Sequence, residues 1–503
     1  MSVPEDFVVI DTLRVDQIIV EPKRVQATYT AVRPDGTASS MPMAYSYESP
    51  VFDPANPQDR NLAGMMLAQV ALNYGLFCKE IILDGPFDNT DRKFIREMME
   101  NTSREILTNK LLAENPFVRP GFKPVQAGRQ KRYTRARLIF AQAVPSKTTL
   151  PGSRPVPDYG AYAILSSGGK DSLLSYGLAR ELGEAHPIFI NESGRHWFTA
   201  VNAYRAFREK EPNTGRVWTN SDRVFSWMLK QLPFIRADFS SIRSDNYPIR
   251  LWTVAVFIFG AVPIALKRGA GNLLIGNEYD TTVRCKTQGI GHYCGLYDQS
   301  KFFDNALTRY YRKKGWHLKQ FSLLRSLSEL LIMKILTERY PELQSHQVSC
   351  HAAHEAEGRM RPCGKCEKCR RIIGMMTALK SDPGHCGYTP QQVSEGLTQL
   401  ASNPVKQLGS DSSHLYHLLL QQGSLPVNDY TRGAARPHPE ILKLRFDMER
   451  SCLEDLPMPV RKPLFRILEP YAEGCVRREA GTWQPYELQD MVLEQTKYTP
   501  YAI

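Results

Sequence analysis

Beyond residue 160 the chain alternates between short apolar runs and longer segments in which apolar residues recur with helical spacing. Short apolar runs bounded by polar turns are typical of buried strands, and the longer segments are typical of helices that cover them. The predicted strands are residues 162–165, 186–191, 216–219 and 272–275, and the predicted helices are residues 172–182, 197–209, 223–232 and 250–267. This repeated strand–helix order predicts an α/β fold built on a doubly wound parallel sheet.

Two regions flank this pattern and differ from it in character. Before it, expected strands (7–10, 17–19, 25–31, 80–83 and 137–144) mix with two expected helices (62–77 and 91–112), and a proline-bearing stretch over 144–159 indicates a linker. After it, helices are expected at 415–422, 438–453 and 460–468. We therefore expect an α+β module over residues 1–150, the parallel-sheet domain over 151–384 and a helical extension over 385–503.

The first predicted strand ends in Ser-Ser-Gly-Gly-Lys-Asp-Ser, a run that no apolar core would hold. A glycine-rich turn between a strand and a helix directs backbone N–H groups and the positive end of the helix toward one point, which suits phosphate. Lys170 can neutralise phosphate charge, and Asp171 indicates a bound Mg²⁺ because a carboxylate does not bind phosphate directly. The residues expected to hold the phosphates are Ser166, Ser167, Gly168, Gly169, Lys170, Asp171 and Ser172, with Lys170 and Asp171 as the catalytic pair.

Two other predicted strands also end in polar residues. Ligands of parallel α/β sheets bind beyond the carboxyl ends of the strands, so we expect these ends to meet the phosphate loop in one pocket. The second strand ends at Asn191 and Glu192, for which a plain polar loop and a contact to adenine or ribose are equally good interpretations. The fourth strand is followed by Gly276, Asn277, Glu278, Tyr279 and Asp280, which favour a functional role by their position.

Four of the ten cysteines gather in one stretch: Cys350, Cys363, Cys366 and Cys369. Thiolates at this spacing can turn toward one ion, and four sulfurs suit tetrahedral Zn²⁺. An iron–sulfur cluster is the alternative, but the ferredoxin run places a further cysteine where this chain has Ile373. His351 or His354 could replace one sulfur. The expected metal is a structural zinc ion.

Composition and charge change this picture little. The 503 residues carry a net charge of +12 and are 42% hydrophobic, which is ordinary for a soluble protein and permits an anionic partner. The longest apolar run, residues 251–266, is shorter than the roughly 20 residues that a membrane span needs. The N-terminus has no signal-peptide character, and clustered cysteines indicate a reducing cytoplasm.

Basic and aromatic residues interleave over 305–319, where they could bind nucleic acid through phosphate contacts and stacking. A helix with one wet face and one packed face is the favoured interpretation. The residues concerned are Arg309, Arg312, Lys313, Lys314 and Lys319, with Tyr310, Tyr311 and Trp316. His414 and His417, one helical turn apart without carboxylate or cysteine partners, are expected on the surface.

Residues 167–172 resemble the S-G-G-x-D-S loop of the ATP pyrophosphatase (PP-loop) superfamily and do not fit the Walker pattern. Together with the C-x₁₂-C-x₂-C-x₂-C pattern that follows, the chain resembles the 7-cyano-7-deazaguanine synthase (QueC) family over about residues 160–380. Tyr-Pro-Ile-Arg ending at Arg250, and the segment at Asp298, are similar to regions of that family. Its G-x-N-x-x-D segment is shortened here to residues 276–280.

The resemblance implies a PP-loop domain that binds ATP with Mg²⁺ and carries a structural zinc ion. It implies an ATP-dependent ligase in which the carboxylate of a deazaguanine-type substrate attacks the α-phosphorus, pyrophosphate leaves, and a nitrogen nucleophile displaces AMP. Relatives of this kind also occur in bacterial antiphage systems. The expected further contacts are Asn191 for ATP, and Arg250, Gly276, Asn277, Glu278, Asp280 and Asp298 for the substrate.

Two other functions remain open on the sequence. Sulfuration of tRNA by a PP-loop enzyme would need a redox cysteine or cluster and would use the basic aromatic stretch to bind RNA. A nucleotide-sensing subunit of a defence complex would bind ATP without turnover. The intact loop over residues 167–172 favours turnover instead. Residues 1–150 and 385–503 carry no chemistry of their own, so we expect them to bind a macromolecular partner, with protein favoured over nucleic acid.

Overall fold

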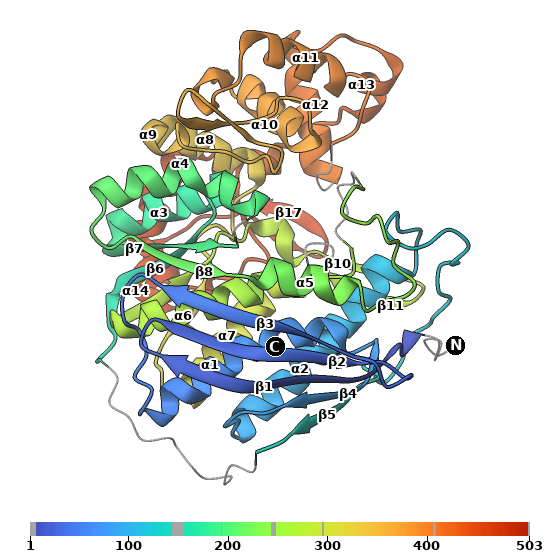
Figure 1. Ribbon diagram of the computed structural model, residues 1–503. Helices are drawn as coiled ribbons and strands as arrows, with labels where there is room; N and C mark the ends of the chain where they lie inside the picture. The colour runs from blue at the N-terminus through green and yellow to red at the C-terminus, as the bar shows by residue number, and fades with distance from the viewer. Residues whose placement is uncertain are drawn as a thin grey trace.

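The computed structural model describes residues 7–142, 155–192, 194–242, 248–293, 296–405 and 409–500 (Figure 1). A ten-stranded sheet crosses it in the order β12-β9-β6-β7-β8-β3-β2-β1-β4-β5. Its strands are β1 (Ile10–Glu21), β2 (Arg24–Val32), β3 (Ala38–Tyr47), β4 (Cys78–Leu83), β5 (Arg137–Phe140), β6 (Asp158–Ser166), β7 (Glu184–Asn191), β8 (Gly215–Thr219), β9 (Ala270–Leu274) and β12 (Lys319–Phe321).

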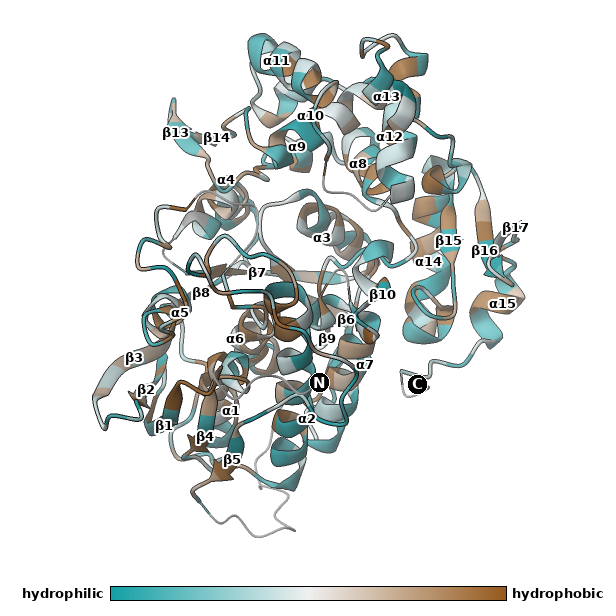
Figure 2. Cartoon of the chain, turned by 90° about the vertical axis from the view of Figure 1, so that its right-hand side faces the viewer, coloured by the Kyte–Doolittle hydropathy of each residue, from teal (hydrophilic) through white to brown (hydrophobic). Residues whose placement is uncertain are grey.

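The half of the sheet from β12 to β8 is parallel and follows the predicted α/β pattern. Along β6, Ala161 and Ala163 belong to the core that contains α6 (Val254–Lys267). Tyr162 and Ile164 belong to the core that contains α3 (Lys170–Leu182). Successive strand residues point to opposite faces, so helices cover both faces here. Figure 2 shows hydrophobic residues gathered along the strands and α6. The predicted α/β class is confirmed.

The N-terminal strands join this sheet directly. β3 pairs antiparallel with β8, and Tyr45 lies opposite Thr219. The hydroxyls of Tyr45 and Tyr47 donate to the backbone carbonyls of Val256 and Gly260 in α6, at 3.1 and 2.9 Å. β2 and β1 continue antiparallel, and β4 and β5 return to parallel pairing. The expected α+β module over residues 1–150 and the parallel-sheet domain therefore share one sheet and one core.

Most predicted helices of the first two regions lie within a few residues of their expected positions. Residues 62–77 form α1 followed by a 3₁₀ segment, and residues 91–112 form α2 followed by a π-helical turn. The bounds are α1 (Pro57–Ala68), the 3₁₀ segment (Gln69–Tyr74), α2 (Asn89–Ile106), the π turn (Leu107–Leu111), α4 (Arg195–Lys210) and α5 (Ser221–Leu229). Most of the predicted linker over 144–159 lies outside the described residues.

The basic aromatic stretch forms α7 (Lys301–Lys313) and the turn after it. Tyr310, Tyr311 and Trp316 are all buried, and the Nζ atom of Lys314 lies 3.0 Å from the buried carboxylate of Asp91. The aromatic rings therefore pack into the core and offer no surface on which bases could stack. This arrangement agrees with the favoured interpretation of a helix with one packed face.

The C-terminal region combines helices with a second sheet. Figure 1 shows α10 to α13 above α3 and α4. The elements are α8 (Glu329–Arg339), α9 (Pro341–Gln344), β13 (His354–Ala356), β14 (Arg359–Arg361), α10 (Glu367–Ala378), α11 (Pro390–Leu400), α12 (Gly409–Gln421), α13 (Asp429–Ala434), β15 (Leu444–Phe446), α14 (Met458–Leu468), β16 (Cys475–Glu479), β17 (Thr482–Pro485) and α15 (Asp490–Gln495). The predicted helices over 415–422 and 460–468 correspond to α12 and α14.

Two sequence predictions for this region are wrong. Residues 438–453 do not form a helix: a 3₁₀ turn (Pro439–Leu442) leads into β15, which pairs parallel with β16. The backbone N–H of Arg445 in β15 also donates a hydrogen bond to the Ser326 carbonyl. Tertiary pairing thus overrides the local helical pattern. His414 is buried rather than exposed, because its Nδ1 atom accepts a hydrogen bond from the backbone N–H of His438 at 3.1 Å.

In the described part of the chain, no helix is long and apolar enough to cross a membrane. The apolar run over 251–266 forms the core helix α6, as expected.

Candidate nucleotide site and candidate metal centre

The turn between β6 and α3 is held by close backbone contacts. Gly168 has φ of +75°, and a Cβ atom there would lie 2.2 Å from the carbonyl oxygen of Thr199. The Ser172 hydroxyl stabilises the turn with two hydrogen bonds. It accepts one from the Ser167 N–H at 3.2 Å and donates one to the Gly169 carbonyl at 3.0 Å. A glycine is thus required at position 168, and the turn opens at the N-terminus of α3, where helix N–H groups can bind an anion.

The segment after β9 packs against this turn, as expected for neighbouring strand ends. A Cβ atom on Gly276 would lie 2.9 Å from the backbone of Asp171, so a side chain there would push the two segments apart. Asn277 is buried, and its carbonyl accepts from the Ser322 hydroxyl at 2.7 Å. This packing carries Glu278 to the ammonium group of Lys170.

Lys170 lies at the centre of a buried ion cluster. Its Nζ atom is 2.6 Å from Asp171 Oδ1, 3.1 Å from Glu329 Oε1 and 3.5 Å from Glu278 Oε2. Arg371 approaches the other oxygen of Glu329 at 3.5 Å. The cluster therefore joins four elements that are distant in sequence: the start of α3, the segment after β9, the start of α8 and the first turns of α10.

Burial and the neighbouring charges have opposite effects on the pKa values in this cluster. Burial acts to lower the pKa of Lys170, but the carboxylates of Asp171, Glu278 and Glu329 outweigh it and raise that pKa above its ordinary value. Burial raises the pKa of Glu278 well above its ordinary value; Lys170 opposes this effect, and Glu329 adds to it. Three acidic side chains surround Lys170, and Arg371 pairs with one of them. Their oxygen atoms are of the kind that Mg²⁺ prefers, so the cluster fits a Mg²⁺ ion accompanying phosphates.

A cavity of about 200 Å³ opens beside the cluster. The turn over residues 167–172, called the phosphate turn after its predicted ligand, contributes Ser167, Gly169, Lys170 and Asp171 to the cavity wall. The opposite wall holds residues that the sequence did not single out for this site: His196, Thr199, Glu329, Lys368 and Arg371. They come from α4, α8 and α10, and each has an unremarkable context within its own helix. No local pattern could have identified them, because only the fold brings these helices together.

Two histidines also line this cavity. The rings of His196 and His351 are 4.6 Å apart, and His351 Nε2 lies 2.9 Å from the Nζ atom of Lys368. Burial, with Arg250 and Lys368 nearby, lowers the pKa of His196 to about 4. His196 is therefore neutral near pH 7 and adds no charge to the cavity.

Several predicted site residues lie outside this cavity wall. Ser166 is buried at the end of β6, and Asn191 ends β7. The guanidinium of Arg250 lies 5.0 Å from the ring centroid of Phe225. Asp280 lines a separate cavity, described below. The Oδ2 atom of Asp298 accepts from the backbone N–H groups at the start of α6, so this residue caps a helix.

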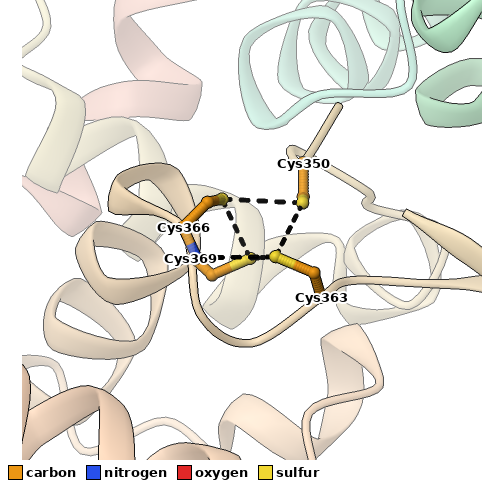
Figure 3. A group of neighbouring side chains, drawn as sticks. All are labelled: Cys350, Cys363, Cys366 and Cys369. Carbon is orange, nitrogen blue, oxygen red and sulfur yellow. Dashed lines mark hydrogen bonds between the residues drawn. The ribbon is translucent and has the colours of Figure 1, made fainter. Parts of the chain in front are cut away.

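The four cysteines form a compact cluster that could hold a metal ion such as zinc (Figure 3). Cys350 Sγ lies 3.3 Å from Cys363 Sγ and 3.5 Å from Cys366 Sγ, and Cys369 Sγ lies 3.5 and 3.8 Å from Cys366 and Cys363. Sulfurs placed tetrahedrally 2.3 Å from one ion would be about 3.8 Å apart. Four thiolates this close fit a single ion. His351 and His354 are not part of the cluster.

The cysteine cluster borders the cavity. Cys366 caps α10 and Cys369 lies in its first turn, beside Lys368 and Arg371. Cys350 and Cys369 are fully buried in a core that also includes Leu330 of α8. A metal ion here would fix the start of α10, and through it the two cations that face the phosphate turn.

No family model, curated protein or solved structure matches this chain.

We expect Gly168→Ala to abolish nucleotide binding, because the added Cβ would collide with the Thr199 carbonyl and displace the turn. Gly36→Ala is a matched control: Gly36 has a similar φ of +82° but no atom within 4 Å of a new Cβ. Both variants should lose roughly 1–3 kcal/mol of stability to backbone strain. Calorimetric titration with ATP should show binding in Gly36→Ala only. Full ATP affinity in Gly168→Ala would show that this turn does not bind the nucleotide.

Asp298→Asn should flatten the pH dependence of stability. Burial raises the pKa of Asp298 to about 7, although backbone N–H groups oppose it. Because the folded pKa is raised, stability from this residue is lost as pH rises from its ordinary pKa through about 7. Asn keeps an acceptor for α6 without the charge. Urea unfolding should show that the free energy of unfolding differs less between pH 5 and pH 8 in Asp298→Asn than in the unmodified chain. In Asp429→Asn, where the side chain is exposed, this difference should equal that of the unmodified chain.

Cys366→Ser should release the metal and loosen the α10 region, because structural metal binding contributes directly to folding free energy. We expect about one Zn²⁺ per unmodified chain by elemental analysis, and a zinc-poor, protease-sensitive Cys366→Ser protein. Cys475→Ser, which changes a cysteine in β16 outside the cluster, should keep its zinc. Iron with labile sulfide in the unmodified protein would contradict the zinc assignment.

Proposed function

We propose that this protein is an ATP-dependent ligase of the PP-loop type, similar to the QueC family, that adenylates a carboxylate and couples it to a nitrogen nucleophile. The observation that supports this most is the phosphate turn at the start of α3, which opens on a cavity walled by Lys170, Glu329 and Arg371. Anion-binding backbone, buried cations and magnesium-compatible carboxylates are the parts that pyrophosphate release from ATP requires.

The residues around the cavity take three different roles in the proposed reaction. The turn over residues 167–172 binds the β- and γ-phosphates through its N–H groups and hydroxyls. Lys170 and Arg371 neutralise the charge that develops on the leaving pyrophosphate. Asp171, Glu278 and Glu329 would hold Mg²⁺, which supplies positive charge to the phosphates when bound. Positioning and charge stabilisation suffice for this step, so no side-chain nucleophile is needed.

The proposed reaction has two steps. A substrate carboxylate oxygen bonds to the α-phosphorus, and the bond to the pyrophosphate oxygen breaks. A nitrogen nucleophile then attacks the acyl carbon, and AMP leaves with the oxygen that came from the carboxylate. A deazaguanine-type carboxylate is the proposed substrate, with ammonia or an amine on a protein partner as the nucleophile, and antiphage defence is the proposed setting. We propose that the chain acts in the cytoplasm.

The two alternatives make different demands on the same site. A tRNA sulfuration enzyme would need a reactive sulfur near the α-phosphate, but no cysteine is among the residues that line the described cavity. The buried rings of α7 also leave the expected RNA-stacking surface closed. A nucleotide-sensing subunit would bind ATP in the same turn and release no pyrophosphate.

Asp171→Asn and Ser167→Ala should each reduce pyrophosphate release by about 100-fold or more, because both change groups placed at the phosphates and metal. Asp429→Asn is the control. With 7-carboxy-7-deazaguanine labelled with ¹⁸O in its carboxylate, mass spectrometry should find one ¹⁸O in AMP. ADP and phosphate as products, or unlabelled AMP, would contradict adenylation of the carboxylate. ATP binding without any product would support the sensing subunit.

A further inference from the structure

A second cavity, of about 260 Å³, lies between the segment after β9 and the small sheet of β15, β16 and β17. Glu278 reaches the Lys170 cluster, whereas the next two residues, Tyr279 and Asp280, line this second cavity. Its other wall comes from the C-terminal region and includes Arg445, Arg450 and Arg478. Three guanidinium groups therefore surround one small space outside the candidate nucleotide site.

Arg445 is the most unusual of the three. It is only 2% exposed, and its Nε and Nη2 atoms have no hydrogen-bond partner among the residues that the structure describes. These two atoms form one edge of the guanidinium, the edge that can bind both oxygens of a carboxylate or phosphate. The group is held in place by other contacts: its Cζ atom lies 4.0 Å from the ring centroid of Tyr279, and Nη1 lies 3.9 Å from Asp411. A buried guanidinium with an open edge is costly unless an anion occupies it.

The rest of the wall adds charge and flat apolar surface. Arg450 lies 5.2 Å from the centroid of the same Tyr279 ring, and Arg478 lies 5.9 Å from that of Trp483. The two rings are 5.9 Å apart. The Tyr279 hydroxyl donates to Asp447 at 3.1 Å, which fixes the ring. Aromatic faces between guanidinium groups suit a planar ligand that carries an anion.

The wall also has acceptors. Asp280 and Glu440 line the cavity, and Glu440 lies 3.3 Å from Nδ1 of His438. A bare anion would be repelled by these carboxylates, whereas a ring with its own N–H or O–H donors could bind them. Three cations and two acids line the cavity, and Asp411 and Asp447 lie behind Arg445 and Arg478. The open edge of Arg445 favours an oxyanion, and the acids favour donor groups on the same ligand.

We propose that this cavity is a second ligand site, separate from the phosphate turn, that binds a carboxylate or phosphate group carried by a small planar molecule. Arg445 holds the oxyanion through its open edge, Arg450 supports it, and Tyr279 and Trp483 contact the ring. The proposal does not depend on ATP turnover. Because the segment over 276–280 touches both sites, a ligand here would lie directly behind the residue that contacts Lys170.

The test uses the full-length protein and two probes, 4-aminobenzoate and inorganic phosphate, in calorimetric titrations. Arg450→Gln removes one cation from a partly exposed position and should weaken binding by about tenfold or more, the effect of losing a charged hydrogen bond. Arg445→Gln should abolish binding if it folds. The control is Arg432→Gln, which changes an exposed arginine in the same region and should bind like the unmodified chain.

The outcomes separate this site from the phosphate turn. Binding of 4-aminobenzoate that is weakened in Arg450→Gln and kept in Asp171→Asn supports the second site with a carboxylate ligand. Phosphate binding with the same pattern supports it with a phosphate ligand. If neither probe binds at millimolar concentration, or if binding is lost in Asp171→Asn and kept in Arg450→Gln, the proposal is wrong. These titrations measure binding only and do not require pyrophosphate release. Failure of the ligase proposal would appear in the pyrophosphate assay and would leave the binding results unchanged.

Discussion

The ion cluster around Lys170 is the interaction on which the rest of the site depends. A buried ammonium group is tolerated only when carboxylates pair with it, and here these come from three separate segments. Glu329 in turn contacts Arg371 on α10, the helix that also carries Cys366 and Cys369 at its start. The phosphate turn, the segment after β9 and the cysteine cluster are therefore linked through charges whose separation would leave a buried ion unpaired.

The sequence was sufficient for the features whose cause is local. Alternating apolar runs predicted the strands β6 to β9 because buried parallel strands must be apolar on both faces. The turn over 167–172 was recognisable because two glycines and a lysine have no place in a core. The clustering of Cys363, Cys366 and Cys369 follows from their spacing, and Cys350 could be added because it was the nearest remaining cysteine upstream.

The features that the sequence did not predict have causes that are distant along the chain. β3 was missed because residues 38–47 begin with polar residues and include Pro42; its pairing with β8 depends on contacts such as those of Tyr45 with α6. Glu329 resembles an ordinary acid in the first turn of a helix, which favours it for reasons unrelated to the cluster. Arg445 lies in a segment with a helical pattern, but that segment pairs with β16 and its side chain is buried beside Tyr279 and Asp411.

The region before the parallel strands shares their sheet and core, and the region after residue 384 lines the second cavity, which changes how a partner should be sought. Removing β1 to β5 would expose β8 as an open edge and take away the tyrosines that hold α6, so the truncated chain would differ in more than partner binding. The C-terminal helix α14 places Leu464 and Phe465 in the same core as α3, and β15 contributes Arg445 to the second cavity. The macromolecular partner expected from the sequence should therefore be sought with the intact chain, because single exposed substitutions can separate partner binding from folding where deletions cannot.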